Sequence, residues 1–194
     1  MRRAKLIRKT KETEIAVSLN LDGEGKSKIK TGIGFLNHLL EVFSAHSLID
    51  LVLRAKGDLH VDQHHTVEDI AIALGQALKK ALGDKQGIRR YGSAYVPMDE
   101  SLARCVVDLS GRPYLVLSAK LSQRMTKDLE AEMVEEFFRA LAANLGANLH
   151  LELLYGRNSH HQLEALFKAF ALAMRTAWEK DPRRKGIPSS KGTL

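Results

Sequence analysis

The pattern His-His-x-x-Glu occurs twice in the chain, once in each half. In an α-helix, residues four apart lie on the same face, whereas adjacent residues point about 100° apart. The first histidine of each copy therefore shares a face with the glutamate, and the two side chains could bind one ion. These pairs are His64 with Glu68 and His160 with Glu164.

The second histidine of each copy, His65 or His161, points away from its own pair and cannot easily reach the same ion. The simplest use of all six ligands is two metal ions with crossed contributions. His161 would then join the first pair, and His65 would join the second. Crossing within one chain and crossing between chains are both compatible with the sequence.

Imidazole and carboxylate ligands without thiolate suit Mn, Fe, Co, Ni or Zn, and three protein ligands are typical of an open, catalytic site. The alternative is that histidine pairs at helix starts are capping or surface residues, but a second copy at the matching place favours metal binding. His38 lies one helix before the first copy, and Glu136 is near its equivalent in the second half. Each half could thus offer a fourth ligand, and the glutamates would offset the positive end of each helix dipole.

Both halves repeat one order of elements: strand, strand, helix, strand, helix, with the motif opening the last helix. In the first half we expect two strands within 12–31, a helix at 34–47, a strand at 50–57 and a helix at 64–83. In the second half we expect strands at 104–110 and 114–120, a helix at 131–146, a strand at 148–156 and a helix at 158–178. Ser159 and Gln162 resemble a capping box, which would place both histidines of that copy in the first turn.

This repetition predicts an internal duplication of an α+β unit with ββαβα-type halves. The predicted boundaries are a first half at 1–92, a second half at 93–185 and a tail at 186–194. Helices packed on one face of each mixed sheet, similar to the split βαβ arrangement, form the simplest architecture.

Composition narrows the class of protein. The chain has 194 residues, a net charge of +7 and one cysteine, Cys105. The single thiol excludes an internal disulfide framework and fits the reducing cytosol, and no apolar run approaches the length of a membrane span. The charge indicates an anionic partner. Because no basic stretch alternates with aromatic residues, a small phosphorylated ligand fits better than a nucleic acid.

Four long segments resemble the imidazoleglycerol-phosphate dehydratase family of histidine biosynthesis. They read "TGIGFLNHLL", "HVDQHHTVEDIAIALGQAL", "RRYGSAYVPMDESLARCVVDLSGRPYLV" and "LHLELLYGRNSHHQLEALFKAFALAM". The resemblance covers nearly the whole chain. It implies a duplicated fold similar to the second domain of ribosomal protein S5, and a homo-oligomer of twenty-four subunits built from trimers, with active sites at subunit boundaries.

The resemblance also implies two manganese ions per active site. One ion would be held by His38, His65, His160 and Glu164, and the other by His64, Glu68, His161 and the residue at position 136. This is the same crossed pairing that the helical spacing predicts. The family often has histidine where this chain has Glu136, although manganese accepts carboxylate oxygen readily.

By resemblance, the motif residues and Glu12 are catalytic, with Glu12 as the general base and acid. The implied substrate contacts are Glu12, His38, His46, Arg90, Arg112, Ser190, Lys191 and Gly192. The implied reaction removes water from a glycerol side chain attached to imidazole. The ring pushes out the neighbouring hydroxyl to give a diazafulvene, the adjacent C–H becomes acidic, and its loss gives an enol that becomes the ketone imidazole acetol phosphate.

Two other classes of protein share some of these features. A metal-dependent phosphohydrolase would also need two metals and a phosphate pocket, but it would release inorganic phosphate. A nucleic-acid-binding module would show steep salt-dependent RNA binding and would have no need of the His-Glu motifs.

Overall fold

A computed structural model describes residues 2–194. The first half forms a four-stranded sheet of β1 (Arg3–Lys9), β2 (Thr13–Asn20), β3 (Ser27–Lys30) and β4 (Asp50–Gly57) in the order β1-β2-β4-β3. The second half forms a sheet of β5 (Tyr91–Met98), β6 (Ser101–Asp108), β7 (Tyr114–Ser118) and β10 (Asn148–Tyr155) in the order β5-β6-β10-β7. A small hairpin of β8 (Met125–Thr126) and β9 (Leu129–Glu130) lies outside both sheets.

The two sheets share one topology. In each sheet, the first three strands in the sheet order pair antiparallel. The fourth strand in that order pairs parallel with its neighbour, as β3 does with β4 and β7 with β10. The expected α+β class with mixed sheets is confirmed. Each half begins with one strand more than predicted, β1 or β5, so the observed order in each half is βββαβα.

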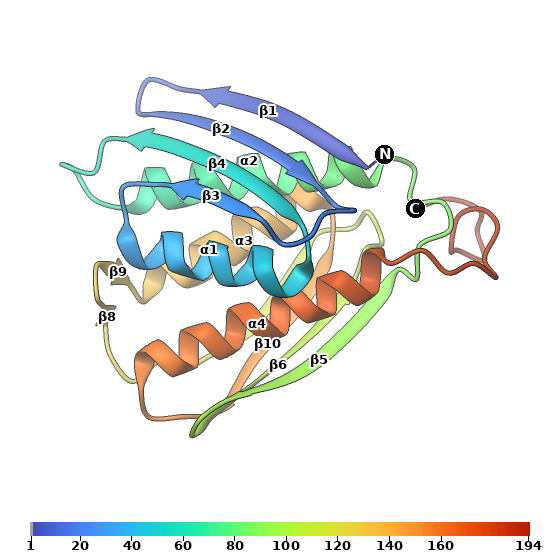
Figure 1. Cartoon of the computed structure of the whole chain (residues 1–194). Coiled ribbons are helices and arrows are strands. Elements are labelled where there is room, and N and C mark those ends of the chain that lie inside the picture. Colours follow the sequence, from blue (N-terminus) through green and yellow to red (C-terminus); the bar gives the residue numbers. More distant parts are fainter. Residues whose placement is uncertain (1) are drawn as a thin grey trace.

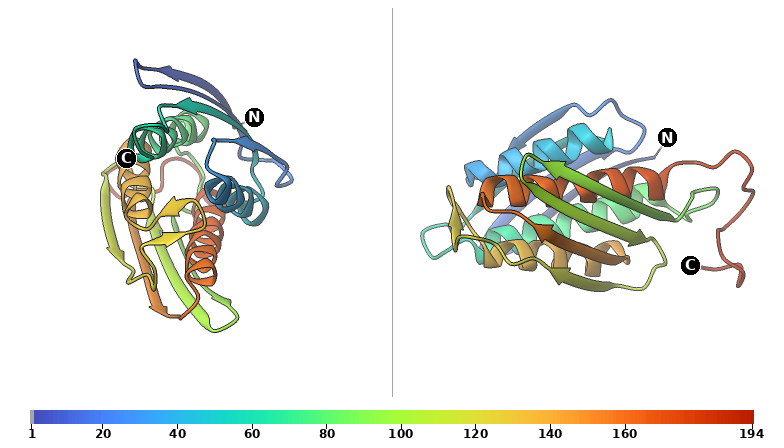
Figure 2. Two further views of the ribbon diagram at one scale, coloured as in Figure 1. Left: turned by 90° about the vertical axis from the view of Figure 1, so that its left-hand side faces the viewer. Right: turned by 90° about the horizontal axis from the view of Figure 1, so that it is seen from below.

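Four helices lie in a layer between the two sheets, as Figures 1 and 2 show. They are α1 (Gly34–Ser47), α2 (His64–Leu82), α3 (Glu132–Leu145) and α4 (Ser159–Trp178). These bounds lie within a residue or so of the predicted ones, because apolar residues recur at helical spacing along each segment. In α2, for example, the predicted inward residues Val67, Ile70, Leu74, Leu78 and Leu82 are all buried.

The helices pair between the halves of the chain rather than within them. Helix α1 packs against α4, and α2 packs against α3. The rings of Phe43, on α1, and Phe170, on α4, stack with centroids 5.0 Å apart. Both halves therefore contribute to one continuous hydrophobic core.

None of the helices within residues 2–194 is long and apolar enough to cross a membrane.

Close approach of α4 to β5 requires a glycine at position 92. A Cβ atom on Gly92 would lie 1.9 Å from the carbonyl oxygen of Ala173, which is backbone and cannot turn aside. Ser93, the next residue of the same strand, faces the opposite side and is exposed.

We therefore predict that Gly92→Ala destabilises the protein by about 3 kcal/mol, the upper end of the usual cost of overpacking. Thermal denaturation at a fixed protein concentration should show a Tm several degrees lower than wild type, whereas Ser93→Ala should leave it nearly unchanged. An unaltered Tm for Gly92→Ala would contradict this account of the α4–β5 contact.

Candidate metal centre

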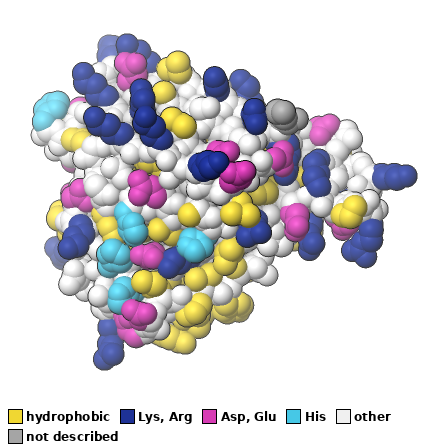
Figure 3. Space-filling view, viewed as in Figure 1, with side chains coloured by type: hydrophobic (Ala, Val, Ile, Leu, Met, Phe, Trp, Pro, Cys, Tyr) yellow, Lys and Arg dark blue, Asp and Glu magenta, His cyan; other side chains and the backbone are white. Residues whose placement is uncertain are grey.

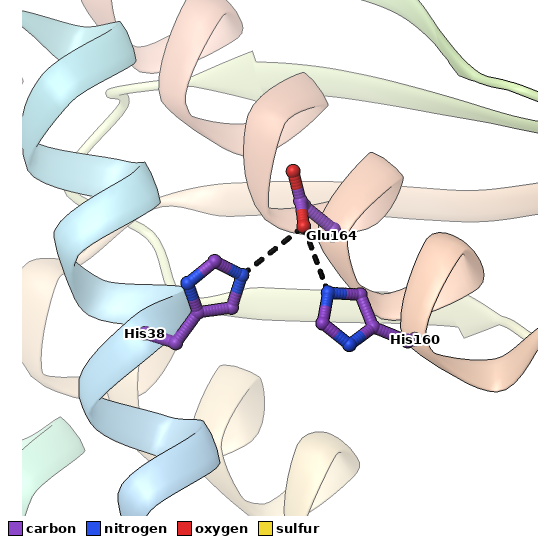
Figure 4. A group of neighbouring side chains, drawn as sticks. All are labelled: His38, His160 and Glu164. Carbon is purple, nitrogen blue, oxygen red and sulfur yellow. Dashed lines mark hydrogen bonds and ion pairs between the residues drawn. The ribbon is translucent and has the colours of Figure 1, made fainter.

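Three of the predicted ligands come together where α1 crosses the start of α4 (Figure 4). The Nε2 atoms of His38 and His160 each lie 3.1 Å from Oε2 of Glu164. One ligand atom from each of the three residues lies within 4.8 Å of the other two, close enough to share one ion. His160 and Glu164 are four residues apart on one helix face, as predicted, while His38 comes from the other half of the chain.

Glu164 is buried, and its charge is already compensated. Burial raises the pKa of this carboxyl group, but hydrogen bonds from Lys168 and His38 outweigh it and lower the pKa to about 2. Lys168 Nζ lies 2.7 Å from Oε1, whereas Oε2 faces the two imidazoles. The carboxylate is therefore ionised and oriented with one oxygen towards the histidines, as a metal ligand must be.

The adjacent histidines of each motif diverge. The rings of His64 and His65 are nearly perpendicular, at 86° with centroids 6.4 Å apart, and those of His160 and His161 are at 83° and 6.2 Å. In the second copy, His160 lies beside Glu164 whereas His161 lies beside Glu100, so these two side chains point in different directions.

A carboxylate fixes the ring of each second histidine. Nδ1 of His65 lies 2.9 Å from Oδ2 of Asp58, and Nδ1 of His161 lies 2.7 Å from Oε2 of Glu100. The hydrogen bond that His161 donates to Glu100 raises the pKa of His161, and the hydrogen bond that His65 donates to Asp58 raises the pKa of His65. The hydrogen bond from His161 also lowers the pKa of Glu100 well below its ordinary value. The backbone N–H of Asn158, which also donates to this carboxylate, makes the next largest contribution. Such carboxylates set the tautomer of a histidine and leave Nε2 as its ligand atom.

The other predicted ligand set is less closely assembled. Among residues 2–194, His38, His160 and Glu164 form the one group whose ligand atoms are close enough together to hold an ion. The carboxylate of Glu136, on α3, accepts a hydrogen bond of 2.8 Å from Nη1 of Arg139. A shared site of Glu136 with His64 and Glu68 stays a prediction.

Local caps and a hairpin position the ligand helices. Asn158 is the N-cap of α4, and its side chain accepts hydrogen bonds from the backbone N–H groups of His160 and His161. The predicted Ser159–Gln162 capping box is wrong, because Gln162 instead accepts from the backbone N–H of Ser122. Both histidines nevertheless lie in the first turn.

The hairpin β8–β9 connects the beginnings of two ligand helices. Oδ1 of Asp128 accepts from the backbone N–H of Phe35 at 2.8 Å, at the start of α1. The backbone carbonyl of Asp128 accepts from the side-chain amide of Gln63, just before α2, at 2.7 Å. A segment of the second half therefore holds the helices that carry His38 and His64.

The predicted phosphate contacts lie around a second cavity. It has a volume of about 410 Å³ and is lined by Arg90, Tyr91, Ser110, Arg112, Ser189, Ser190, Lys191, Thr193 and Leu194. Arg90 is held firmly there: Nε lies 2.7 Å from Oδ1 of Asp108, and Nη1 donates to the carbonyl of Pro188 at 3.0 Å. Its φ of 76° is unusual for a residue with a side chain, and such strain is often found at functional sites. Gly192 lies in the same tail, and its N–H donates to the carbonyl of Ser189.

The cavity and the histidine cluster lie at opposite ends of α4. The N–H of Arg90 donates to the carbonyl of Ala177 in the last turn, whereas His160 is in the first turn. At a rise of 1.5 Å per residue, these two points are separated by about 25 Å. Helix α4 therefore keeps the two sets of predicted site residues apart within one chain.

The remaining predicted site residues lie near the histidine end. Oε2 of Glu12, in the turn between β1 and β2, is 3.9 Å from Nδ1 of His65. His46 is two turns beyond His38 on α1. Burial lowers the pKa of His46, and the nearby positive charge of Lys168 lowers it further. Figure 3 shows His side chains beside Asp and Glu side chains on the face over α1 and α4. A cavity of about 920 Å³ opens at this end, and its lining includes Glu100, Arg157, Asn158, His160 and His161.

Sequence reasoning missed three residues that contact the predicted metal ligands. Asp58 is hydrogen-bonded to His65, Glu100 to His161, and Lys168 forms an ion pair with Glu164. Lys168 had a usable signal, because it lies four residues after Glu164 on the same helix face. Asp58 and Glu100 had none. Asp58 follows β4 and Glu100 precedes β6, so the two carboxylates occupy different places in the two halves.

Comparison with known proteins identifies relatives along the whole chain. The family model described as imidazoleglycerol-phosphate dehydratase matches residues 31–174. A protein of that name from Acetivibrio thermocellus is 55% identical over 193 residues, which cover 100% of this chain and 99% of the relative. A protein of the same name from Listeria welshimeri is 56% identical over 194 residues, and the alignment covers 100% of both chains.

Solved structures agree with the sequence relatives. The crystal structure of imidazoleglycerol-phosphate dehydratase from Staphylococcus aureus superposes with a TM-score of 0.84 at 43% identity, covering 92% of this chain and 99% of that one. The enzyme from Pyrococcus furiosus, solved in complex with (S)-C348, also gives a TM-score of 0.84, at 35% identity, and covers 97% of this chain and 100% of its own.

The carboxylate behind His161 provides a test of the metal centre. Glu100→Gln keeps the size of the side chain but removes the charge that orients the imidazole, so we expect the affinity for one bound divalent ion to fall about 10–100-fold. Metal content after dialysis against graded chelator would measure this. Glu24→Gln, which alters an exposed glutamate paired only with Lys26, is the matched control. Equal metal retention in the two variants would contradict the assigned role of Glu100.

Proposed function

The chain belongs to the imidazoleglycerol-phosphate dehydratase family, and we propose that it performs the dehydration with two manganese ions held by its paired motifs. The protein is a hydro-lyase of histidine biosynthesis. The observation that carries the metal proposal is the convergence of His38, His160 and Glu164 on one point. The single buried thiol of Cys105 fits the reducing cytosol in which we place the reaction.

The proposed ligands of the first ion are His38, His160 and Glu164, completed by His65. Those of the second are His64, Glu68 and Glu136, completed by His161. Imidazole and carboxylate donors suit manganese, and the carboxylates behind His65 and His161 are typical of metal-binding histidines. When bound, the two ions would supply Lewis acidity to the imidazole ring of the substrate and a template for its position.

The phosphate end of the substrate would bind in the cavity of Arg90, Arg112, Ser190 and Lys191. Arginine forks and a lysine provide charge-assisted hydrogen bonds to phosphate oxygens. The guanidinium of Arg90 is held in place by its salt bridge to Asp108, and the backbone N–H of Arg90 is hydrogen-bonded to the carbonyl of Ala177. Because the side chain is already ordered, little conformational freedom would be lost when phosphate binds.

One chain cannot hold both ends of one substrate molecule. Five covalent bonds separate the ring carbon from the phosphorus atom, which is less than about 10 Å. The metal cluster and the phosphate cavity of one chain are separated by about 25 Å along α4. We therefore propose that the active site is completed by another copy of the chain. The resemblance to the family implies that this assembly is a homo-oligomer of twenty-four subunits built from trimers.

Glu12 is the proposed general base and acid. Its carboxylate is half exposed and lies 3.9 Å from the ring of His65. In the proposed sequence, the hydroxyl next to the ring leaves as the ring pushes electrons outward, which gives the diazafulvene. Glu12 then takes the proton of the adjacent C–H, and the resulting enol becomes the ketone, imidazole acetol phosphate, when a proton returns to the carbon next to the ring. His46 lies on the same side and is a proposed substrate contact.

The direct test is to incubate the purified protein with imidazoleglycerol phosphate and Mn²⁺ and to identify the product. We expect the ketone, with its phosphate retained, and no inorganic phosphate. Exhaustive chelation should abolish turnover and reduce the size of the particle, because ligands from separate segments lose the ion that holds them together, and Mn²⁺ should restore both. Full activity in a sample shown by elemental analysis to be free of metal would refute the two-metal proposal, and release of inorganic phosphate would indicate a phosphohydrolase.

The shared active site predicts complementation between inactive variants. Glu164→Gln and Lys191→Ala should each be nearly inactive, because one removes a metal ligand and the other a phosphate contact. When the two are co-expressed in equal amounts, about a quarter of the sites should combine an intact Glu164 from one chain with an intact Lys191 from another. Activity should then recover to about that fraction, whereas a mixture of Glu164→Gln with Glu164→Ala should stay inactive. No recovery in assembled mixed particles would show that each chain supplies both residues to its own site.

A further inference from the structure

The turn that carries Glu12 is held by two threonines. Strands β1 and β2 are connected by residues 10–12, and Oγ1 of Thr10 lies 3.1 Å from the backbone nitrogen of Glu12 and 2.9 Å from that of Thr13. Oγ1 of Thr13 lies 3.2 Å from Oγ1 of Thr10. Glu12 is thus fixed through its backbone, while its side chain remains half exposed.

A buried carboxylate on α2 determines the direction of these hydrogen bonds. Asp69 is 5% exposed and pairs with Arg8, whose Nη2 lies 2.7 Å from Oδ1. An ionised carboxylate only accepts hydrogen bonds, so the hydroxyl of Thr13, which contacts Oδ2, must donate to it. Since the hydroxyl proton of Thr13 is already donated to Asp69, the hydroxyl of Thr10 must donate to Oγ1 of Thr13. The lone pairs of Thr10 Oγ1 are then free to accept the N–H groups of Glu12 and Thr13.

This chain of hydrogen bonds begins on the same turn of α2 as the first metal-binding motif. Asp69 directly follows Glu68 and lies four residues after His65, so His65 and Asp69 share a helix face. At the other end of the chain, Oε2 of Glu12 is 3.9 Å from Nδ1 of His65. The buried carboxylate therefore links the backbone of Glu12 to the helix that presents His65.

The second half of the molecule uses the equivalent position differently. Glu100 directly precedes β6, as Glu12 directly precedes β2. The carboxylate of Glu100 is fully occupied, because it accepts from Ser101, Arg157, Asn158 and His161. The residue equivalent to Asp69 in the second motif is Ala165, which offers no acceptor. The first half thus anchors the backbone of its glutamate and leaves the carboxylate free.

We propose that Asp69 is a positioning residue for the dehydration: acting through Thr13 and Thr10, it holds the carboxylate of Glu12 in register with His65. This inference rests on the proposed role of Glu12 as the base. Asp69 does not touch the substrate. Its effect arises because a proton-transferring group must be held close to its productive geometry, and a displacement of about 1 Å can lower the rate about 100-fold.

The test breaks the relay at two points. Thr10→Val removes the acceptor of the Glu12 N–H but keeps the buried Asp69–Thr13 bond, so the fold is preserved. Thr13→Val removes the donor to Asp69, and Thr13→Ser restores it. We expect Thr10→Val and Thr13→Val to lower kcat about 10–100-fold with unchanged KM and metal content, and Thr13→Ser to approach wild type. Thr176→Val, which removes a threonine hydroxyl bonded to Leu172 on α4, is the matched control and should have wild-type kcat.

A double variant separates positioning from a general structural effect. If Thr13 acts only through the carboxylate of Glu12, Thr13→Val should cause no further loss of kcat in an enzyme that already carries Glu12→Gln. A further loss of similar size in that background would overturn the proposal. So would wild-type kcat for both Thr10→Val and Thr13→Val beside an inactive Glu12→Gln. Wild-type kcat for Glu12→Gln itself would instead refute Glu12 as the base and, with it, a relay that serves that base.

Discussion

The helix layer shared by the two sheets is the constraint on which the rest of the structure depends. Each sheet buries only one face, and each helix has one apolar stripe that must be covered. Placing all four helices between the sheets satisfies both requirements with one core, to which both halves contribute. The helices then pair between the halves, α1 with α4 and α2 with α3. The meeting of His38 with His160 and Glu164 follows directly from this pairing.

The two halves of the chain are similar in topology, but they differ in the residues that support the second histidine of each motif. The sheet order is the same in both, and both last helices begin with the same motif. A carboxylate supports the second histidine of each motif, but it is Asp58 after β4 in one half and Glu100 before β6 in the other. Because Asp58 supports His65, Glu12 is not needed for that purpose, and its carboxylate remains available for the proton transfer that we propose.

The length of α4 connects the fold to the proposed assembly. A helix of twenty residues keeps the histidine cluster and the basic cavity about 25 Å apart, and a small phosphorylated substrate cannot span that distance. If the proposed metal and phosphate sites are correct, the same helix that brings His160 and Glu164 onto one face prevents a single chain from binding both ends of its substrate. In the proposed assembly, a second copy of the chain supplies the missing end.

The sequence by itself determined the helices, the last three sheet strands of each half and the motif, because these depend on local spacing. Apolar residues recur at helical intervals through residues 34–47 and 159–178, and His160 and Glu164 share a face in any helix. The first strand of each half was missed: β1 is rich in basic residues and has few apolar ones, and β5 contains Gly92 and Pro97, which are unusual in strands. Only the tertiary structure decided that His38 meets α4, that Asp58 and Glu100 orient His65 and His161, and that Asp69 reaches the turn of Glu12. These contacts join residues that are far apart in the chain or placed differently in its two halves, and no local periodicity encodes such distances.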